Sequence, residues 1–427
     1  GCLEQTTSKA FPQLYIGNVM ELPDRFVQQM RANVEGGLRK MTQFQRSDGS
    51  FNYWPGGDNY DTWTSVYAGH FLIEADRLGY AIPGNLKTNW LAFQRKAARD
   101  WNNSTSQGWT RQQTQFTQAY RLYVLALAKS NEIAAMNRLR DQSGLDLRTK
   151  WMLAAAYARI GQVDAAKALV KDLETNVPQY TEMYWTYGSD LRDEALIAEA
   201  LLGMGETARA AAVVQRISKR LSAESWYSTQ STCFGLMAVA RLTEKSQLGK
   251  GLSYSITLGG KSQDKFSEKA ISRTELTIPD GKASVALNNT GKNLLYVRVV
   301  RTGTPLAGEE RASKNGLNMA VSYENLNHDP IDPKRIEQGT DFIAEVTVSH
   351  PGILGPYYQL ALTQVFPGGW EIRNSRMEGN ENGTASDYFT YQDIRDDRVM
   401  TYFDLYKGRS VTYRLMMNAA YTGRYYL

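Results

Sequence analysis

Residues 151–173 read WMLAAAYARIGQVDAAKALVKDL, and this stretch predicts the architecture of the first half of the chain. Its apolar residues recur at helical spacing on both sides of Gly161, which stands where a glycine ends one helix before the next begins. Residues 192–221, RDEALIAEALLGMGETARAAAVVQRISKRL, repeat this design with a break at 203–205. Both stretches therefore predict helical hairpins.

The same helical periodicity runs through most of residues 1–245. In residues 115–130, QFTQAYRLYVLALAKS, the apolar positions follow i, i+3, i+4, i+7 spacing. Consecutive hairpins of this kind form either an open solenoid of the tetratricopeptide type or a closed toroid of about six hairpins. Because the hairpins vary in length and show no fixed period, a closed α/α toroid is favoured. Similar helices are expected around 24–45, 62–78, 84–100 and 228–243.

From about residue 250 the pattern changes to the period of two that is typical of β-strands. The fold class predicted is therefore multidomain, with an α/α toroid first and β-sandwich domains after it. The expected domains are a helical domain at 1–247, a β domain at 248–312 that is too short for a sandwich of its own, and a separate β-sandwich at 313–427. The expected strands are 251–259, 272–278, 282–288, 294–303, 317–325, 341–349, 357–366 and 410–418.

The composition is that of an ordinary globular protein of 427 residues, with a net charge of +5. No segment concentrates Lys and Arg enough for a nucleic-acid groove, and the longest apolar runs are too short to span a bilayer. No phosphate-loop or metal-ligand motif supports a cofactor or a metal. Because the chain starts Gly1-Cys2, without Met or a signal peptide, we expect it to be a fragment or a processed piece of a longer protein.

Two cysteines are too few for a disulfide framework, and each has its own explanation. Cys233 lies in an expected apolar helix, where a free cysteine behaves as a small buried hydrophobic residue. Cys2 is either an incidental thiol or the partner of Gln5 in a thioester. Attack of the Cys2 thiolate on the side-chain carbonyl of Gln5 would expel ammonia and close a ring across residues 2–5. The product would be an activated acyl donor, because a thiolate is a good leaving group.

A thioester also reacts with water, so it must be shielded by apolar or aromatic side chains until it is needed. The aromatic residues nearest to Cys2 in sequence are Phe11 and Tyr15. The last β domain is also rich in tyrosine. We hypothesise that aromatic side chains of that domain, Tyr402 among them, cover the bond between Cys2 and Gln5.

The start of the chain, GCLEQ at residues 1–5, resembles the GCGEQ thioester motif of the α2-macroglobulin and complement superfamily. The segment FPGGWEI at 366–372 looks like the last domain of that family, so the resemblance covers essentially the whole chain. Leu3 replaces the usual glycine, as in the bacterial members, and this position therefore does not need a positive φ. Residues 43–80 look like part of the family's thioester domain, with matches at Asp48, Gly49, Ser50, Phe51, Thr62, Trp63 and Thr64.

The resemblance implies a domain type and a function for each part. Residues 1–247 would be the thioester domain, 248–312 the second half of a CUB domain, and 313–427 a macroglobulin-like domain of the receptor-binding type. The implied function is broad-spectrum protease inhibition in bacterial envelope defence. A protease cuts a bait region outside this chain, and the exposed thioester then acylates a lysine of the attacking protease. Such capture involves no turnover, so the chain is not expected to be an enzyme.

In that mechanism Cys2 supplies the leaving thiolate and Gln5 the acyl carbon, while Gly1, Leu3 and Glu4 flank the pair and shape its conformation. The partners implied by the resemblance are target proteases, the remaining N-terminal domains of the same protein, and a penicillin-binding protein of peptidoglycan synthesis. The implied location is the periplasm, with an anchor to the inner membrane by an N-terminal lipid outside this fragment.

The placement of histidine bears on which group the thioester would acylate. Some complement proteins carry a histidine well after the cysteine that directs the thioester toward hydroxyl groups. This chain has no histidine between His70 and His328. Protein lysine amines are therefore the expected targets, and His70 is expected to be a helix-face residue without a chemical role.

Two other functions fit parts of the sequence. The carboxyl groups of Asp58, Asp61 and Glu74 could line a carbohydrate cleft beside the aromatic rings of Tyr53 and Trp54. Paired carboxylates serve glycan cleavage, and α/α toroids followed by β-sandwiches occur in polysaccharide-degrading enzymes. The same stretch also reads as a turn-rich loop with an aspartate at a helix N-cap.

The second alternative makes the thiol of Cys2 the nucleophile of an acyltransferase. Such a nucleophile needs a histidine and an aspartate or asparagine beside it, and histidine is scarce in this chain.

Overall fold

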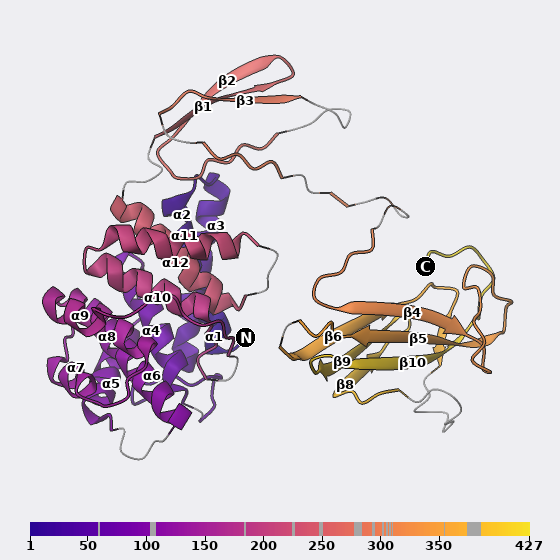
Figure 1. Ribbon diagram of the computed structural model, residues 1–427, viewed down its shortest axis with the longest axis horizontal. Coiled ribbons are helices and arrows are strands. Elements are labelled where there is room, and N and C mark those ends of the chain that lie inside the picture. The colour runs from indigo at the N-terminus through magenta and orange to yellow at the C-terminus, as the bar shows by residue number, and fades with distance from the viewer. Residues whose placement is uncertain are drawn as a thin grey trace. The chain divides into compact units, whose positions relative to one another are not determined.

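The computed structural model forms two compact units, residues 1–298 and residues 299–427, and each is described by itself (Figure 1). The structure describes every residue except 59, 103–107, 183–184, 224–226, 247–250, 277–283, 293–294, 301–302, 305, 307–308, 310, 354 and 374–385.

The first unit is built around a closed ring of buried helices. Each helix of the ring contacts the next, and the last contacts the first (Figure 1). Helix α4 lies inside the unit, because every residue from Trp63 to Ala75 is buried and the helix therefore has no solvent-exposed face along this length. The ring consists of α1 (Leu3–Ala10), α4 (Thr62–Arg77), α6 (Gly108–Leu127), α8 (Leu147–Arg159), α10 (Asp190–Gly203) and α12 (Thr229–Ser246).

A second layer of helices packs outside this ring and buries only one face. In α11 (Thr207–Leu221) the buried positions are Ala210, Val213, Val214 and Ile217, which is the stripe of an amphipathic helix. This layer confirms the predicted α/α toroid. Its other helices are α3 (Asp24–Met41), α5 (Leu86–Asp100), α7 (Ile133–Arg140) and α9 (Val163–Val170). Short α2 (Ile16–Val19) and the 3-10 turns Phe11–Leu14 and Thr42–Phe44 complete the helical part.

Glycines end the inner helices where the sequence predicts. Gly161 has φ +84°, and the N–H of the next residue, Gln162, donates to the carbonyl of Tyr157 at 2.9 Å. At the second break it is Gly205, with φ +78°, that takes this role, while Gly203 lies inside α10. These left-handed positions are cheap only for glycine, which is why they mark the hairpin turns in the sequence.

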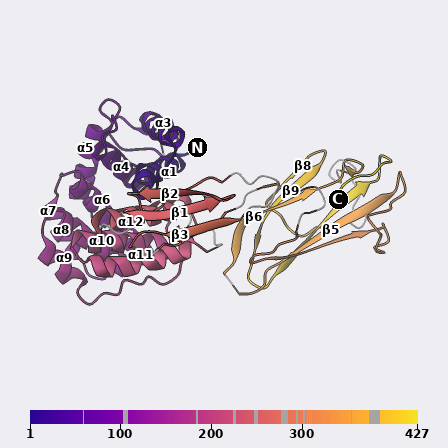
Figure 2. The ribbon, with the colours of Figure 1, turned by 90° about the horizontal axis from the view of Figure 1, so that it is seen from above.

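A small antiparallel sheet with the strand order β2-β1-β3 completes the first unit. Its strands are β1 (Leu252–Leu258), β2 (Lys261–Ser267) and β3 (Val285–Asn289). Figure 2 shows the three strands side by side. After β2 the chain returns to the helical part, where Ile271 forms a bridge with Met20 just beyond α2.

The second unit is a β-sandwich of two antiparallel sheets with the orders β4-β5-β10-β7 and β6-β9-β8. Side chains from both sheets pack between them, and the rings of Phe403 and Tyr413 lie 5.1 Å apart. This packing confirms the predicted β-sandwich. The strands are β4 (Asn318–Glu324), β5 (Asp341–Ser349), β6 (Tyr357–Val365), β7 (Glu371–Arg373), β8 (Tyr391–Ile394), β9 (Arg398–Leu405) and β10 (Ser410–Asn418).

Two strand predictions are wrong for the described residues. Residues 272–276 and 295–300 are not strands, although the second segment is rich in Val and Tyr. A strand needs the backbone of a neighbour, and Tyr296 and Val299 are instead 86% and 77% exposed. The sequence also missed β2, β7, β8 and β9. The division at 247 and 248 lies outside the described residues, and the three-domain division 1–247, 248–312 and 313–427 stays a prediction.

Within the part of the chain that the structure describes, no helix combines the length and the apolar character that crossing a membrane requires.

The core of the toroid holds one buried histidine. His70 of α4 is 1% exposed, and its Nδ1 lies 2.9 Å from the hydroxyl of Tyr120. The ring of Phe11 meets the imidazole edge-to-face at 5.0 Å. Burial lowers the pKa of His70 from 6.5 to about 4, because the apolar surroundings disfavour the charged form.

This burial predicts a loss of stability in mild acid. The pKa of His70 is lower in the folded than in the unfolded protein, so the unfolded state takes up the proton first as the pH falls. Stability contributed by neutral His70 is complete above about pH 6.5 and is lost as the pH falls toward about 4. The full loss amounts to roughly 3 kcal/mol.

The measurement is urea unfolding, followed by the helical circular dichroism signal, at neutral pH and at about pH 5. We expect His70→Gln to lose less stability between these two pH values than the parent protein. His328→Gln is the matched control, since the side chain of His328 is half exposed. An equal loss in the parent and in His70→Gln would contradict the assignment.

Candidate functional site

The side chains of Cys2 and Gln5 are brought together by the first turn of α1. Cys2 is the N-cap of this helix, and its Sγ accepts the backbone N–H of Gln5 at 3.4 Å. In return the Oε1 of Gln5 accepts the backbone N–H of Cys2 at 3.3 Å. This is a capping box in which Cys replaces the usual Ser or Thr. The C-x-x-Q spacing therefore places thiol and carboxamide side by side on one helical turn.

The residues flanking the pair explain two features of the motif. A Cβ on Gly1 would lie only 2.7 Å from the Oε1 of Gln5, so a larger residue there would displace the carboxamide. Leu3 is fully buried inside α1, and its N–H donates to the carbonyl of Tyr53 at 3.0 Å. Leu3 thus has an ordinary helical conformation and anchors the start of α1 in the core.

Glu4 points into the protein and links α1 to α12. It is 6% exposed and accepts hydrogen bonds from Ser8 at 2.6 Å and from Thr229 at 3.5 Å. Burial raises the pKa of Glu4, and the hydrogen bonds from Ser8 and Thr229 oppose this rise. Ser8 in turn lies 3.2 Å from the hydroxyl of Tyr67. Glu4 therefore orients α1 within the ring.

Two tyrosines that the sequence did not indicate as shields of a thioester, Tyr53 and Tyr187, lie near Cys2. The carbonyl of Tyr53 accepts the N–H of Leu3, the residue next to Cys2, and burial first and the nearby Cys2 side chain next raise the pKa of the Tyr53 hydroxyl. Tyr187 stacks on Tyr53, with ring centroids 6.4 Å apart, an angle of 15° and a hydroxyl-to-hydroxyl distance of 2.8 Å. We call Tyr53 and Tyr187 the tyrosine pair. Cys2 is 2% exposed beneath it, whereas Gln5 is exposed on this unit.

Only one member of the tyrosine pair had a readable signal. Tyr53 follows Phe51 closely in the stretch that resembles the family's thioester domain. Tyr187 has φ +51°, a left-handed conformation that the sequence around it does not predict.

Of the three aromatic residues named from the sequence as candidate shields, Phe11 and Tyr15 are buried in the first unit and Tyr402 belongs to the second. Phe11 is fully buried and packs on His70 in the core. Tyr15 donates a hydrogen bond of 2.7 Å to the buried carboxylate of Glu74. Tyr402 lies in β9 of the second unit. A shielding role for these three residues stays a prediction.

The second cysteine and the carboxylates fit structural roles. Cys233 is fully buried in α12, and burial raises its pKa to about 12. Asp61 caps α4 by accepting the N–H of Thr64 at 2.6 Å, as the helix-start reading predicts. Glu74 is buried and ion-paired with Arg241 at 2.8 Å. Burial would raise the pKa of Glu74, but the charge of Arg241 leads the opposing effects, which lower it to about 2.

These carboxylates therefore do not form the carbohydrate cleft of the first alternative. The imidazole of His70 is buried in the core beside the hydroxyl of Tyr120. It therefore does not serve as the base for a cysteine nucleophile. Among the described residues, His, Cys, Asp and Glu form no group of three or more that could hold a metal ion.

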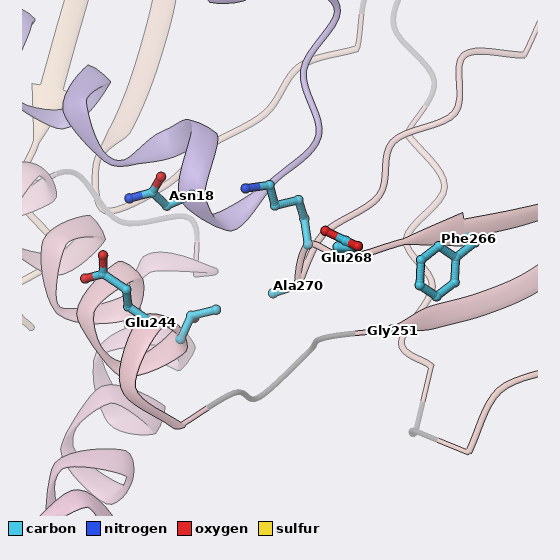
Figure 3. Close-up of a pocket in the computed structure, with 8 residues that line it drawn as sticks. Asn18, Glu244, Gly251, Phe266, Glu268 and Ala270 are labelled. Atoms are coloured by element: carbon cyan, nitrogen blue, oxygen red, sulfur yellow. The ribbon is translucent and has the colours of Figure 1, made fainter. Parts of the chain in front are cut away.

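A pocket of about 670 Å³ lies within the first unit, where the ends of α2 and α12 face β2 and the segment after it (Figure 3). Its polar lining includes Asn18, Glu244, Glu268 and Lys269. Residues 1–5 do not line it, so this pocket is separate from the candidate thioester pair.

The comparisons with known proteins point to one family. Residues 316–427 match the family model described as the bacterial alpha-2-macroglobulin MG10 domain. The α2-macroglobulin of Rickettsia conorii is 22% identical over 441 residues, which cover 99% of this chain and 22% of the relative. That of Escherichia coli is 25% identical over 325 residues, which cover 71% of this chain and 19% of the relative. The chain thus spans about a fifth of the length of these curated relatives.

Solved structures share the fold along the whole chain. A crystal structure of native Escherichia coli α2-macroglobulin from domain MG7 to the C-terminus has a TM-score of 0.57 at 18% identity and covers 100% of this chain and 69% of that one. The structure of Salmonella α2-macroglobulin reacted with methylamine has a TM-score of 0.57 at 22% identity. The match covers 100% of this chain and 28% of that one. The structure of Escherichia coli α2-macroglobulin activated by porcine elastase has a TM-score of 0.50 at 18% identity. The match covers 100% of this chain and 39% of that one.

At these identities the likeness to solved structures establishes the fold. The prediction that the chain is not an enzyme agrees with relatives that are named as α2-macroglobulins. Together the matches confirm the resemblance predicted from the sequence: residues 316–427 match the MG10 domain of the bacterial α2-macroglobulins, and the chain as a whole is similar to their C-terminal region.

Proposed function

We propose that Cys2 and Gln5 form an internal thioester with which the protein captures attacking proteases covalently. The observation that carries this proposal is the capping box, in which each side chain accepts the backbone N–H of the other residue. Loss of ammonia from Gln5 would join the Cys2 Sγ to the Gln5 Cδ across one helical turn. Cys2 is the buried half of this pair, and Gln5 is the exposed half, which presents the acyl carbon.

Capture consists of one acyl transfer. The Nζ of a target lysine attacks the Cδ of Gln5, the bond from Cδ to Sγ breaks, and the lysine is left in an amide with Gln5. The leaving thiolate of Cys2 receives the proton that the amine loses. The positive end of α1, at which Cys2 is the N-cap, favours negative charge on Sγ as it leaves. Each molecule reacts once, as expected for an inhibitor.

The protease target is supported by likeness to known proteins. One solved relative of the same fold is Escherichia coli α2-macroglobulin activated by porcine elastase. We propose that cleavage of a bait region outside this chain triggers the reaction here too. The exposure of Gln5 on the isolated unit supports a role for other domains in covering the bond until then, since a thioester in contact with water hydrolyses.

The cellular setting of the proposal rests on the resemblance alone. It comprises a periplasmic location, a lipid anchor in the inner membrane, and a penicillin-binding protein as a further partner.

The first test is reaction of the native protein with methylamine. We expect stoichiometric release of the Cys2 thiol together with methylamine incorporation at Gln5, both located by peptide mass. Cys2→Ala should abolish incorporation, because no thioester can form. Cys233→Ala is the matched control and should leave it unchanged.

Free alkylation of Cys2 in untreated protein, without methylamine incorporation, would contradict the thioester.

A second test concerns which nucleophile is preferred. Without an imidazole to activate a hydroxyl, the more nucleophilic amine should dominate. Competition between methylamine and glycerol at equal concentration should yield almost only the amide at Gln5, read by peptide mass. A comparable yield of the glycerol ester would contradict the expected preference for lysine.

A further inference from the structure

Arg192 is a buried cation whose hydrogen-bonding capacity is used completely. It lies in α10 with 0% exposure. Its Nε donates to Asp193 at 2.7 Å, and Nη1 donates to the carbonyl of Thr186 and to Gln230, both at 3.2 Å. Its Nη2 donates to the hydroxyl of Tyr180 at 3.2 Å and to that of Thr186 at 3.3 Å. A guanidinium has five N–H groups in a fixed fork, and here each has an acceptor.

The guanidinium is also fixed from the side by aromatic rings. It lies 4.6 Å from the centroid of Trp63 and 5.2 Å from that of Phe116. The indole N–H of Trp63 donates to the same Gln230 oxygen that accepts from Arg192, at 3.2 Å. The ring contacts and the hydrogen bonds together hold the guanidinium group in a single orientation.

The loop that carries Tyr187 rests directly on this guanidinium. A Cβ on Gly188 would lie 2.1 Å from Nη2 of Arg192, so only a glycine lets the backbone pass. Tyr187 between Thr186 and Gly188 has φ +51°, a conformation that costs a non-glycine residue about 1–2 kcal/mol and persists only where neighbours hold it. Ser228 also holds the loop by donating to the carbonyl of Tyr187 at 3.2 Å.

The tyrosine pair connects the loop of Tyr187 to the candidate thioester. The hydroxyl of Tyr187 lies 2.8 Å from that of Tyr53, and the carbonyl of Tyr53 accepts the N–H of Leu3, the residue next to Cys2, at 3.0 Å. We propose that Arg192 is a positioning residue, which holds the loop of Tyr187 over Cys2 and so limits access of water and small nucleophiles to the thioester. The inference rests on the proposed function, but access to Cys2 can be measured independently of it.

The experiment compares Arg192→Lys with Arg121→Lys in the full chain. Arg121 is also a buried arginine of the helical unit, but its guanidinium donates to Gln94 and Gln118 and not to the loop of Tyr187. We expect Arg192→Lys to accelerate both spontaneous and methylamine-driven release of the Cys2 thiol by about tenfold, because lysine cannot replace the fork that holds Thr186. Arg121→Lys should stay within about twofold of the parent.

A double-mutant cycle separates positioning from general destabilisation. If Arg192 acts through Tyr187, then Arg192→Lys should add nothing to the rate of Tyr187→Ala. Multiplicative effects of the two substitutions, or an unchanged rate in Arg192→Lys, would overturn the proposal. Thr186→Val, which removes one acceptor of the fork at the loop, replaces Arg192→Lys if the latter does not fold, and it should also accelerate thiol release.

A second readout covers the case in which the parent takes up no methylamine at Gln5. That result would refute the thioester, while alkylation of Cys2 by iodoacetamide would still report access beneath the tyrosine pair. Faster alkylation in Arg192→Lys than in Arg121→Lys supports the positioning role, and equal rates overturn it.

Discussion

The contact of α1 with both α4 and α12 closes the helical ring, and the geometry of Cys2 and Gln5 depends on it. A helix of eight residues is too short to be stable by itself in water. It forms here because its core side is buried and because Leu3 donates to the carbonyl of Tyr53. Gly37 of α3 allows a close approach, since a Cβ there would lie 2.9 Å from that of Ala10. The capping box is thus maintained by tertiary packing.

The N-terminus of α12 joins the separate parts of the site. Within a few residues, Ser228 binds the carbonyl of Tyr187, Thr229 binds Glu4, and Gln230 binds Arg192. Three regions of the chain meet there: its first turn, the loop before α10 and the last inner helix. Hydrogen bonds in a buried setting are stronger than in water and hold the groups that they join. These bonds therefore couple ring closure to the environment of Cys2.

The sequence predicted the fold wherever the signal was local. The hairpin turn at Gly161 was readable because a left-handed residue favours glycine, and the toroid was readable from helical periodicity. The β region was less readable. Residues 261–267, KSQDKFS, are mostly polar and yet form β2, because β1 supplies a partner. Residues 295–300 have strand composition, yet they are not a strand. Strand formation depends on a neighbour that composition does not reveal.

By itself the sequence determined the helical and β halves, the hairpin turns and the C-x-x-Q spacing of Cys2 and Gln5. Each of these depends on residues that are close together in the chain. Only the tertiary structure decided that Tyr53 and Tyr187 pair beside Cys2 and that Arg192 bonds the loop of Tyr187. The physical reason is that these side chains become neighbours only when α12 packs against α1, and no local periodicity encodes a contact between the first turn of a ring and its last helix.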